Sequence, residues 1–177
     1  MPRSKADIAN AAIRMFLQEV GQFYDQARGF IPYRSMAAQK EEILRFFDHR
    51  CCYCETEIGS RNMSEDHLVP INKTALGLHC WGNIVPSCKA CNEAKHLKSW
   101  DAYLSLVCGG DREALTRRHQ KLFDFLATYA YEPNLPLQEI ANNLYQDVGE
   151  VASTLIRLRL KQAEKIIQQL QSAERST

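Results

Sequence analysis

The chain has 177 residues, of which 45% are hydrophobic and 24% are charged, and its formal net charge at pH 7 is +1. This length and composition suit one globular domain with a sizeable core and helical additions, and no apolar run approaches the length of a membrane span. The near-neutral charge excludes a protein that is basic all over, so any surface that attracts a polyanion must be local.

The first fifty residues predict a helical region. Residues 4–27 carry apolar side chains at steps of three and four residues, which is the period of an amphipathic helix, and Ser4 and Asp7 fit a capping box at its start. A second helix is predicted from about residue 35 to residue 48. It leads directly into the first of two cysteine pairs.

Four of the seven cysteines form two Cys-x-x-Cys pairs, Cys51 with Cys54 and Cys88 with Cys91. Two such pairs can supply the four corners of a tetrahedral zinc site. Cys52 offers a competing chelate with Cys54, but a Cys-x-Cys turn is a poorer one. Because no secretory segment is present, we expect a reducing, cytoplasmic compartment, in which lasting disulfides are unfavourable. The sequence therefore predicts a structural zinc ion.

The segment Asp66-His67-Leu68-Val69-Pro70 lies between the cysteine pairs. A neutral histidine can take a proton from water near pH 7, and a neighbouring carboxylate can hold a divalent ion such as magnesium against a phosphate. We therefore expect His67 and Asp66 to hydrolyse a phosphodiester. Strand neighbours point to opposite faces, so this requires a bend or a bulge. A surface salt bridge is the alternative interpretation of an isolated Asp-His pair.

Asn92 follows the last cysteine, near the start of a helix predicted over residues 88–100. Its amide oxygen could complete the metal site opposite Asp66, although a helix-terminal asparagine often bonds local backbone instead. Lys95 lies three residues later on the same helix face, where its charge can meet a phosphate oxygen. His96 could substitute as a ligand, or it could be a solvated histidine.

Asn83 lies in a turn marked by Gly82. We expect its amide to brace the loop that aims His67, with an ordinary turn asparagine as the alternative.

Together these motifs resemble the HNH endonucleases that carry a four-cysteine zinc cluster. The resemblance covers about a quarter of the chain and is specific in combination. It is carried by Arg50-Cys51-Cys52-Tyr53-Cys54, the DH-x-x-P segment, Asn83-Ile84-Val85 and the C-x-x-C-N-x-x-K run from Cys88 to Lys95.

The resemblance implies an α+β, mostly helical chain with a ββα-metal core, flanked by N- and C-terminal helices. It also implies that His67 is the general base, that Asp66 and Asn92 bind Mg²⁺ or Mn²⁺, and that Asn83 positions the histidine loop. Many members have a Gly-Gly turn after the DH-x-x-P strand, where this chain has residues 72–80. That departure leaves the roles of His79 and Cys80 open.

The remaining residues predict three helices: one capped by Ser99 and running through Val107, one capped by Asp111 and running to about Tyr129, and one from about residue 137 to residue 170, with Gly149 as a candidate interruption. The second helix carries the best basic run, in which Arg117-Arg118-His119 could track a DNA backbone or form a solvated face.

The last predicted helix has an apolar stripe, which could pack on the core, pair with a second copy or a partner protein, or contact DNA; we favour packing or a homodimer. The stripe comprises Val151, Leu155, Leu158, Ala163, Ile166, Ile167 and Leu170.

We therefore divide the chain into an N-terminal helical region (1–50), a nuclease core (51–100) and a C-terminal helical region (101–177). The function predicted is a metal-dependent DNA endonuclease with structural zinc, in a setting such as restriction or phage defence. The alternative is a non-catalytic zinc-dependent module that binds DNA or a partner. Binding alone does not require His67, Asp66, Asn83 and Asn92 together, which favours the enzyme.

Overall fold

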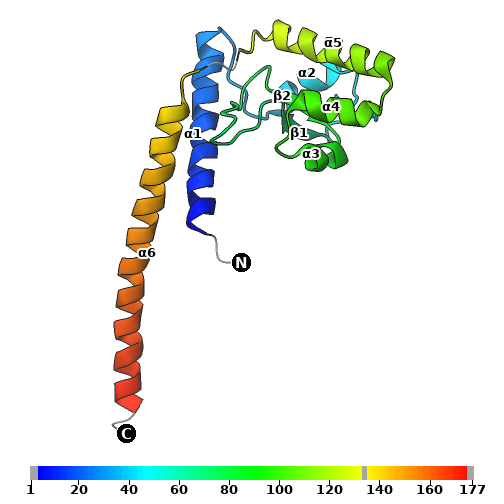
Figure 1. Cartoon of the computed structure of the whole chain (residues 1–177). Helices are drawn as coiled ribbons and strands as arrows, with labels where there is room; N and C mark the ends of the chain where they lie inside the picture. The colour runs from blue at the N-terminus through cyan, green and yellow to red at the C-terminus, as the bar shows by residue number, and fades with distance from the viewer. Residues whose placement is uncertain (1–3, 133–134, 175–177) are drawn as a thin grey trace.

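The computed structural model describes residues 4–132 and 135–174, with side chains as far as residue 166. Six helices and two strands follow one another along these residues (Figure 1). They are α1 (Lys5–Ala27), α2 (Ala37–Phe46), β1 (Ser64–His67), β2 (Ile84–Ser87), α3 (Lys89–Lys95), α4 (Trp100–Cys108), α5 (Arg112–Thr128) and α6 (Gln138–Glu174). No helix of this part of the chain is long and apolar enough to cross a membrane.

The two strands pair antiparallel, and α3 packs against β1. In the register, Asp66 lies opposite Val85 and His67 lies opposite Ile84. This hairpin and helix form the predicted ββα core, and the α+β, mostly helical fold class is confirmed.

The main hydrophobic core joins the hairpin to the helices on both sides of it in the sequence. Ile43 and Leu44 of α2, Leu104 of α4 and Phe125 of α5 are buried in the same cluster as Ile84 of β2. The flanking helices therefore pack directly on the ββα unit. The proposed three-part division of the chain stays a prediction.

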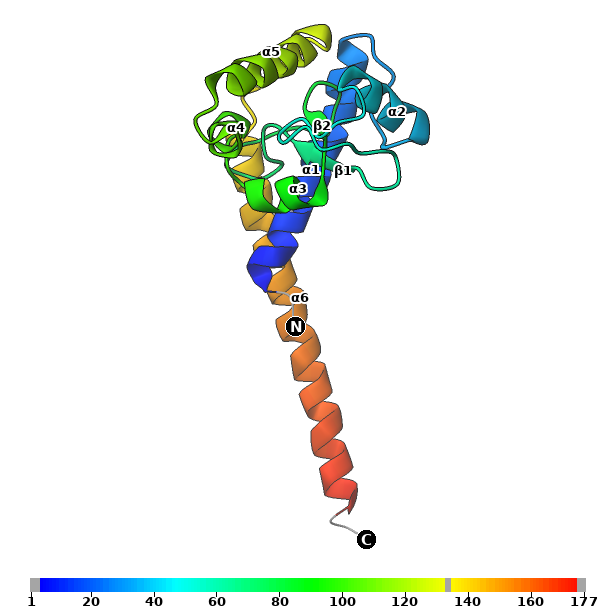
Figure 2. The same cartoon turned by 90° about the vertical axis from the view of Figure 1, so that its right-hand side faces the viewer.

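α1 and α6 form a separate layer in which the two helices lie side by side (Figures 1 and 2). Ser4 and Asp7 make the predicted capping box at the start of α1. α6 runs through Gly149 without a break, so the interruption predicted there is wrong. Gly149 is buried, and the side chain of Lys5 lies where a Cβ atom would be.

The second half of α6 extends past the start of α1, away from the rest of the molecule (Figure 2). Val151, Leu155, Leu158 and Ile166 are each more than half exposed. The expectation that this stripe packs on the core is therefore wrong for these residues. The first residue of α1, Lys5, lies beside Gly149, so α1 does not extend alongside the later part of α6. The side chains of Ile167 and Leu170 lie outside the described residues.

The helix predicted over residues 88–100 ends earlier than expected. α3 ends at Lys95, because His96 has a φ of 48°, which no α-helical residue adopts. A new helix then begins at Trp100, with the side chain of Ser99 accepting a hydrogen bond from Ala102 N, as predicted. The break turns α4 toward α5 and the core.

Candidate active site

The four predicted cysteines converge on one point. Cys51 and Cys54 lie in the turn after α2, Cys88 is the N-cap of α3, and Cys91 lies in its first turn. The four Sγ atoms lie within 4.8 Å of one another, and those of Cys54 and Cys88 are 3.7 Å apart. Four thiolates around a tetrahedral zinc ion would be about 3.8 Å apart. The cluster is thus placed to hold a metal ion, and its donor chemistry fits zinc.

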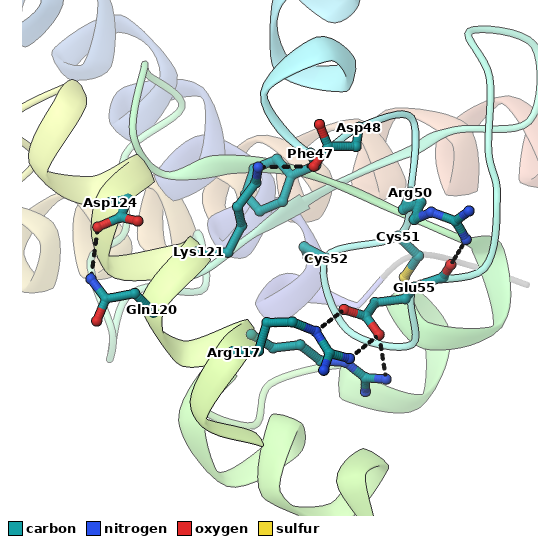
Figure 3. A pocket seen from close by; sticks show the side chains of 11 residues that line it. Phe47, Asp48, Arg50, Cys51, Cys52, Glu55, Arg117, Gln120, Lys121 and Asp124 are labelled. Atoms are coloured by element: carbon teal, nitrogen blue, oxygen red, sulfur yellow. Dashed lines mark hydrogen bonds and ion pairs between the residues drawn. The ribbon is translucent and has the colours of Figure 1, made fainter. Parts of the chain in front are cut away.

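The basic run of α5 holds the turn that carries Cys51 and Cys54 in place. Arg118 donates to the carbonyl oxygen of Tyr53 at 2.6 Å and to Glu55 at 3.0 Å, while Arg117 forms a second ion pair with Glu55 (Figure 3). Lys121 in turn pairs with Asp48, and both line a pocket together with Glu55 and the two arginines. These side chains are paired with acidic groups, so the expectation that Arg117 and Arg118 track a DNA backbone is not supported.

Asp66 points from β1 toward α3 and is 6% exposed. Its carboxylate accepts hydrogen bonds from the hydroxyl of Tyr53 at 2.6 Å and from the backbone N–H of His67 at 2.8 Å. Lys95 Nζ lies 3.3 Å and 3.2 Å from its two oxygens. Burial raises the pKa of Asp66, while Lys95 and Tyr53 act in the opposite direction.

Lys95 also lies in the interior between β1 and α3. Its side chain is fully buried, and Nζ also donates to the backbone oxygen of His67 at 2.7 Å. A substrate phosphate cannot reach an amine in this position. The expectation that Lys95 meets a phosphate oxygen is therefore not met; its ammonium group instead fastens α3 to the end of β1.

Asn92 reaches β1 from the facing helix, where its amide nitrogen lies 3.4 Å from the backbone oxygen of Glu65. Asp66 and Asn92 are thus both on the α3 side of the hairpin, and they offer the hard oxygen donors that magnesium prefers. However, protein donors, Lys95 among them, already occupy both oxygens of Asp66. The residues therefore do not fit a magnesium ion in this conformation. Among the described residues, the cysteines alone form a group of three or more His, Cys, Asp and Glu ligands.

His67 lies on the other face of β1 from Asp66. The register pairs these residues one for one with β2, so the predicted bend or bulge is not present and the two side chains diverge. Burial, followed by the neighbouring His79 and Lys95, lowers the pKa of His67 to about 3. Its imidazole is therefore neutral at pH 7, which is the form a general base requires.

Asn83 is fully buried and makes three side-chain hydrogen bonds to the loop that follows β1. Its oxygen accepts from Val69 N at 2.8 Å, and its nitrogen donates to the carbonyl oxygens of Val69 and Leu78. The backbone oxygen of Asn83 also accepts from Leu68 N, next to His67. These are the contacts that bracing the histidine loop requires.

Three residues beside His67 were not predicted as site residues from the sequence. Nδ1 of His79 lies 3.2 Å from Nε2 of His67, and Ser35 and Glu65 follow beyond His79. His79 falls in the segment that departs from the family pattern, and Ser35 is more than thirty residues from His67 in the sequence. Only the alternation of β1, which puts Glu65 and His67 on one face, could have signalled this group. His96, by contrast, is exposed and lines a groove with Arg14 and Asn72.

Comparison with known proteins gives a match to a protein family. Residues 51–105 match the family model described as HNH endonuclease. No curated protein and no solved structure matches the chain. The matched segment begins at the first cysteine of the metal cluster and contains β1, β2 and α3, so the resemblance inferred from the motifs is confirmed over this segment.

Proposed function

We propose that the chain is a DNA endonuclease that hydrolyses phosphodiester bonds with His67 as general base, since residues 51–105 match the HNH endonuclease family model. The observation that carries this proposal is the geometric support of His67 by the residues around it. Its imidazole is neutral, stands at the end of β1, and is held between the Asn83-braced loop and the anchored end of α3.

The chain's own contribution to catalysis is the placement of one proton acceptor. His67 would take a proton from the attacking water, which makes that water nucleophilic toward the phosphorus atom. Asn83 and Lys95 fix the backbone on either side of the imidazole and thereby its direction. Such support is what keeps a reacting group within a fraction of an ångström of its productive position.

A divalent metal ion would neutralise charge on the scissile phosphate and the leaving oxygen. Asp66 and Asn92 are the residues we propose for Mg²⁺ or Mn²⁺, but only if Lys95 first releases the carboxylate. We assign no step to the ion in the conformation seen here. Lys95 is then a positioning residue rather than a phosphate contact.

We assign the cysteine cluster to a structural Zn²⁺ ion. Zinc is the ion that four thiolates at tetrahedral spacing select, and a closed tetrathiolate site leaves no position for substrate. It ties the turn after α2 to the start of α3 and so keeps α3 on the hairpin.

The direct test is to incubate the purified zinc-loaded protein with supercoiled plasmid, with and without Mg²⁺ or Mn²⁺, and to separate the products on a gel. We expect nicked or linear DNA only when the divalent ion is present. An RNA substrate of matched length in a parallel reaction tests the preference for DNA.

The closed Asp66–Lys95 pair specifically favours the competing function, a non-catalytic zinc-dependent module that binds DNA or a protein partner. Such a module would shift DNA in a gel or bind a partner while leaving the plasmid intact at every metal concentration. That result would contradict the endonuclease.

A further inference from the structure

A line of polar side chains leads away from His67 toward a carboxylate. His67 Nε2 lies 3.2 Å from His79 Nδ1, and the other ring nitrogen of His79, Nε2, lies 3.5 Å from Ser35 Oγ. Ser35 Oγ is in turn 2.7 Å from Glu65 Oε2. The four residues come from three separate parts of the chain, and all are at least partly buried.

The far end of this line is fixed. Glu65 accepts a hydrogen bond from the hydroxyl of Tyr33 at 2.7 Å and forms an ion pair with Lys40 at 3.5 Å. The ring of Tyr33 also packs edge-on against the ring of His79, with centroids 5.4 Å apart. Behind His79, Gly21 of α1 lies so close that a Cβ atom would be 2.4 Å from the backbone oxygen of His79. His79 is thus held from several sides.

The donors and acceptors in the line have one consistent order. An ionised carboxylate only accepts hydrogen bonds, so the hydroxyl of Ser35 donates to Glu65. The Ser35 oxygen is then the acceptor for an N–H at Nε2 of His79. A neutral imidazole carries one N–H, so His79 Nδ1 must be an acceptor, and the hydrogen between the two histidines belongs to Nε2 of His67.

We propose that His79 is a positioning residue that fixes His67 in the tautomer protonated at Nε2, so that Nδ1 is the atom that accepts the proton from water. When Nδ1 takes that proton, His67 becomes a cation whose Nε2–H still donates to Nδ1 of His79. The assignment rests on the proposed role of His67 as general base. It adds which atom acts and which residues determine that atom.

The tautomer can be measured without any activity. In ¹⁵N-labelled zinc-loaded protein, long-range ¹H–¹⁵N correlation spectra distinguish the two tautomers of each histidine, and His67→Gln identifies the His67 signals. We expect His67 to be protonated at Nε2 in the wild type and to become a mixture of tautomers in His79→Ala. A wild-type His67 protonated at Nδ1, or an unchanged tautomer in His79→Ala, would overturn the proposal.

Kinetics give the second measurement. His79→Ala should lower kcat for plasmid nicking about 10–100-fold, as the loss of a supporting hydrogen bond commonly does, while KM and zinc content stay unchanged. His79→Asn places an amide oxygen near the position of Nδ1 and should recover most of the loss. His96→Ala removes an exposed histidine and is the matched control, with wild-type kcat expected.

The two proposals fail in different ways. A wild type that never cuts DNA refutes the endonuclease, while the spectra still decide whether His79 sets the tautomer. An active wild type with full kcat in His79→Ala refutes the role of His79 and leaves the endonuclease standing.

Discussion

Asp66 and His67 are neighbours in the sequence but face opposite sides of β1, and each side has its own polar network. Asp66 is enclosed with Tyr53 and Lys95 in the interior between the hairpin and α3. His67 meets His79 on the other side. The adjacent pair therefore combines a buried, ion-paired anchor with a neutral imidazole, and the anchor holds the backbone that aims the imidazole.

The buried ion pair should be costly to break from one side. Lys95→Met leaves Asp66 charged and without its partner, so we expect the free energy of unfolding to fall by about 3–5 kcal/mol. Guanidinium chloride unfolding of the zinc-loaded protein measures this. Lys98→Met, which removes an exposed lysine three residues away, should change stability by less than about 0.5 kcal/mol. Equal stability of the two variants would show that the pair is not formed.

The sequence predicts residue types and spacing better than it predicts contacts. The four cysteines and the loop contacts of Asn83 follow from local motifs, because each depends on a short segment. The burial of Lys95 does not follow, since a lysine on an amphipathic helix is normally exposed and only the packing of α3 on β1 reveals its partner. The contact of His79 with His67 depends on a loop whose path the sequence leaves open.

Among the secondary-structure elements, α3 depends most on support from outside itself. It has only seven residues, too few for an isolated helix to be stable. The cysteine cluster fixes its first turn and Lys95 fixes its last. The break after α3 could not be predicted from helical periodicity, because His96 adopts a backbone conformation that helix propensity disfavours.

The metal cluster should therefore control the fold of the core. Cys88→Ser removes one thiolate ligand but keeps a hydroxyl that can cap α3, so the variant isolates the effect of the metal, and we expect metal-free protein by elemental analysis and loss of the cooperative thermal transition. Cys108→Ser changes a cysteine outside the cluster and should keep one zinc per chain. An unchanged Tm in Cys88→Ser would contradict the structural role of the metal.

Two helical glycines allow a sharper test of how α1 is packed. In Gly21→Ala the new Cβ meets the backbone of His79, which cannot move without displacing the loop, so we expect a loss of about 1–3 kcal/mol. In Gly149→Ala the new Cβ meets only the flexible end of Lys5, so higher helix propensity should leave stability unchanged or raise it by up to about 1 kcal/mol. Urea unfolding measures both variants, and a gain in Gly21→Ala would show that α1 does not lie against His79.

The molecule as a whole consists of a core built on the ββα unit and a two-helix layer, from which the end of α6 extends (Figure 1). The sequence predicts that α6 is helical and amphipathic. Whether its apolar stripe is buried depends on how much of α6 lies beside α1, which begins at Lys5. The first part of α6 buries Ala141 against α1, whereas Val151 and Leu155 remain exposed. The two parts of this helix should therefore contribute very differently to stability.

Deletion of residues 151–177 should lower the Tm by less than about 2 °C, because it removes no buried side chain among the described residues. Deletion from residue 138 also removes Ala141 and uncovers Ile13 and Leu17 of α1, so a large loss of stability is expected. Differential scanning calorimetry compares the two. A large loss in the shorter deletion, together with a smaller mass in solution, would show that the stripe joins two copies of the chain.

If His67 accepts the proton of the attacking water, His67→Ala should lose most of the DNA cleavage activity. Under single-turnover conditions, with zinc content and Tm matched to the wild type, we predict that plasmid nicking slows about 10²–10⁴-fold. His96→Ala, an exposed histidine in the same protein, should cut at the wild-type rate. Nicking by purified His67→Ala at the wild-type rate would show that His67 is not the general base.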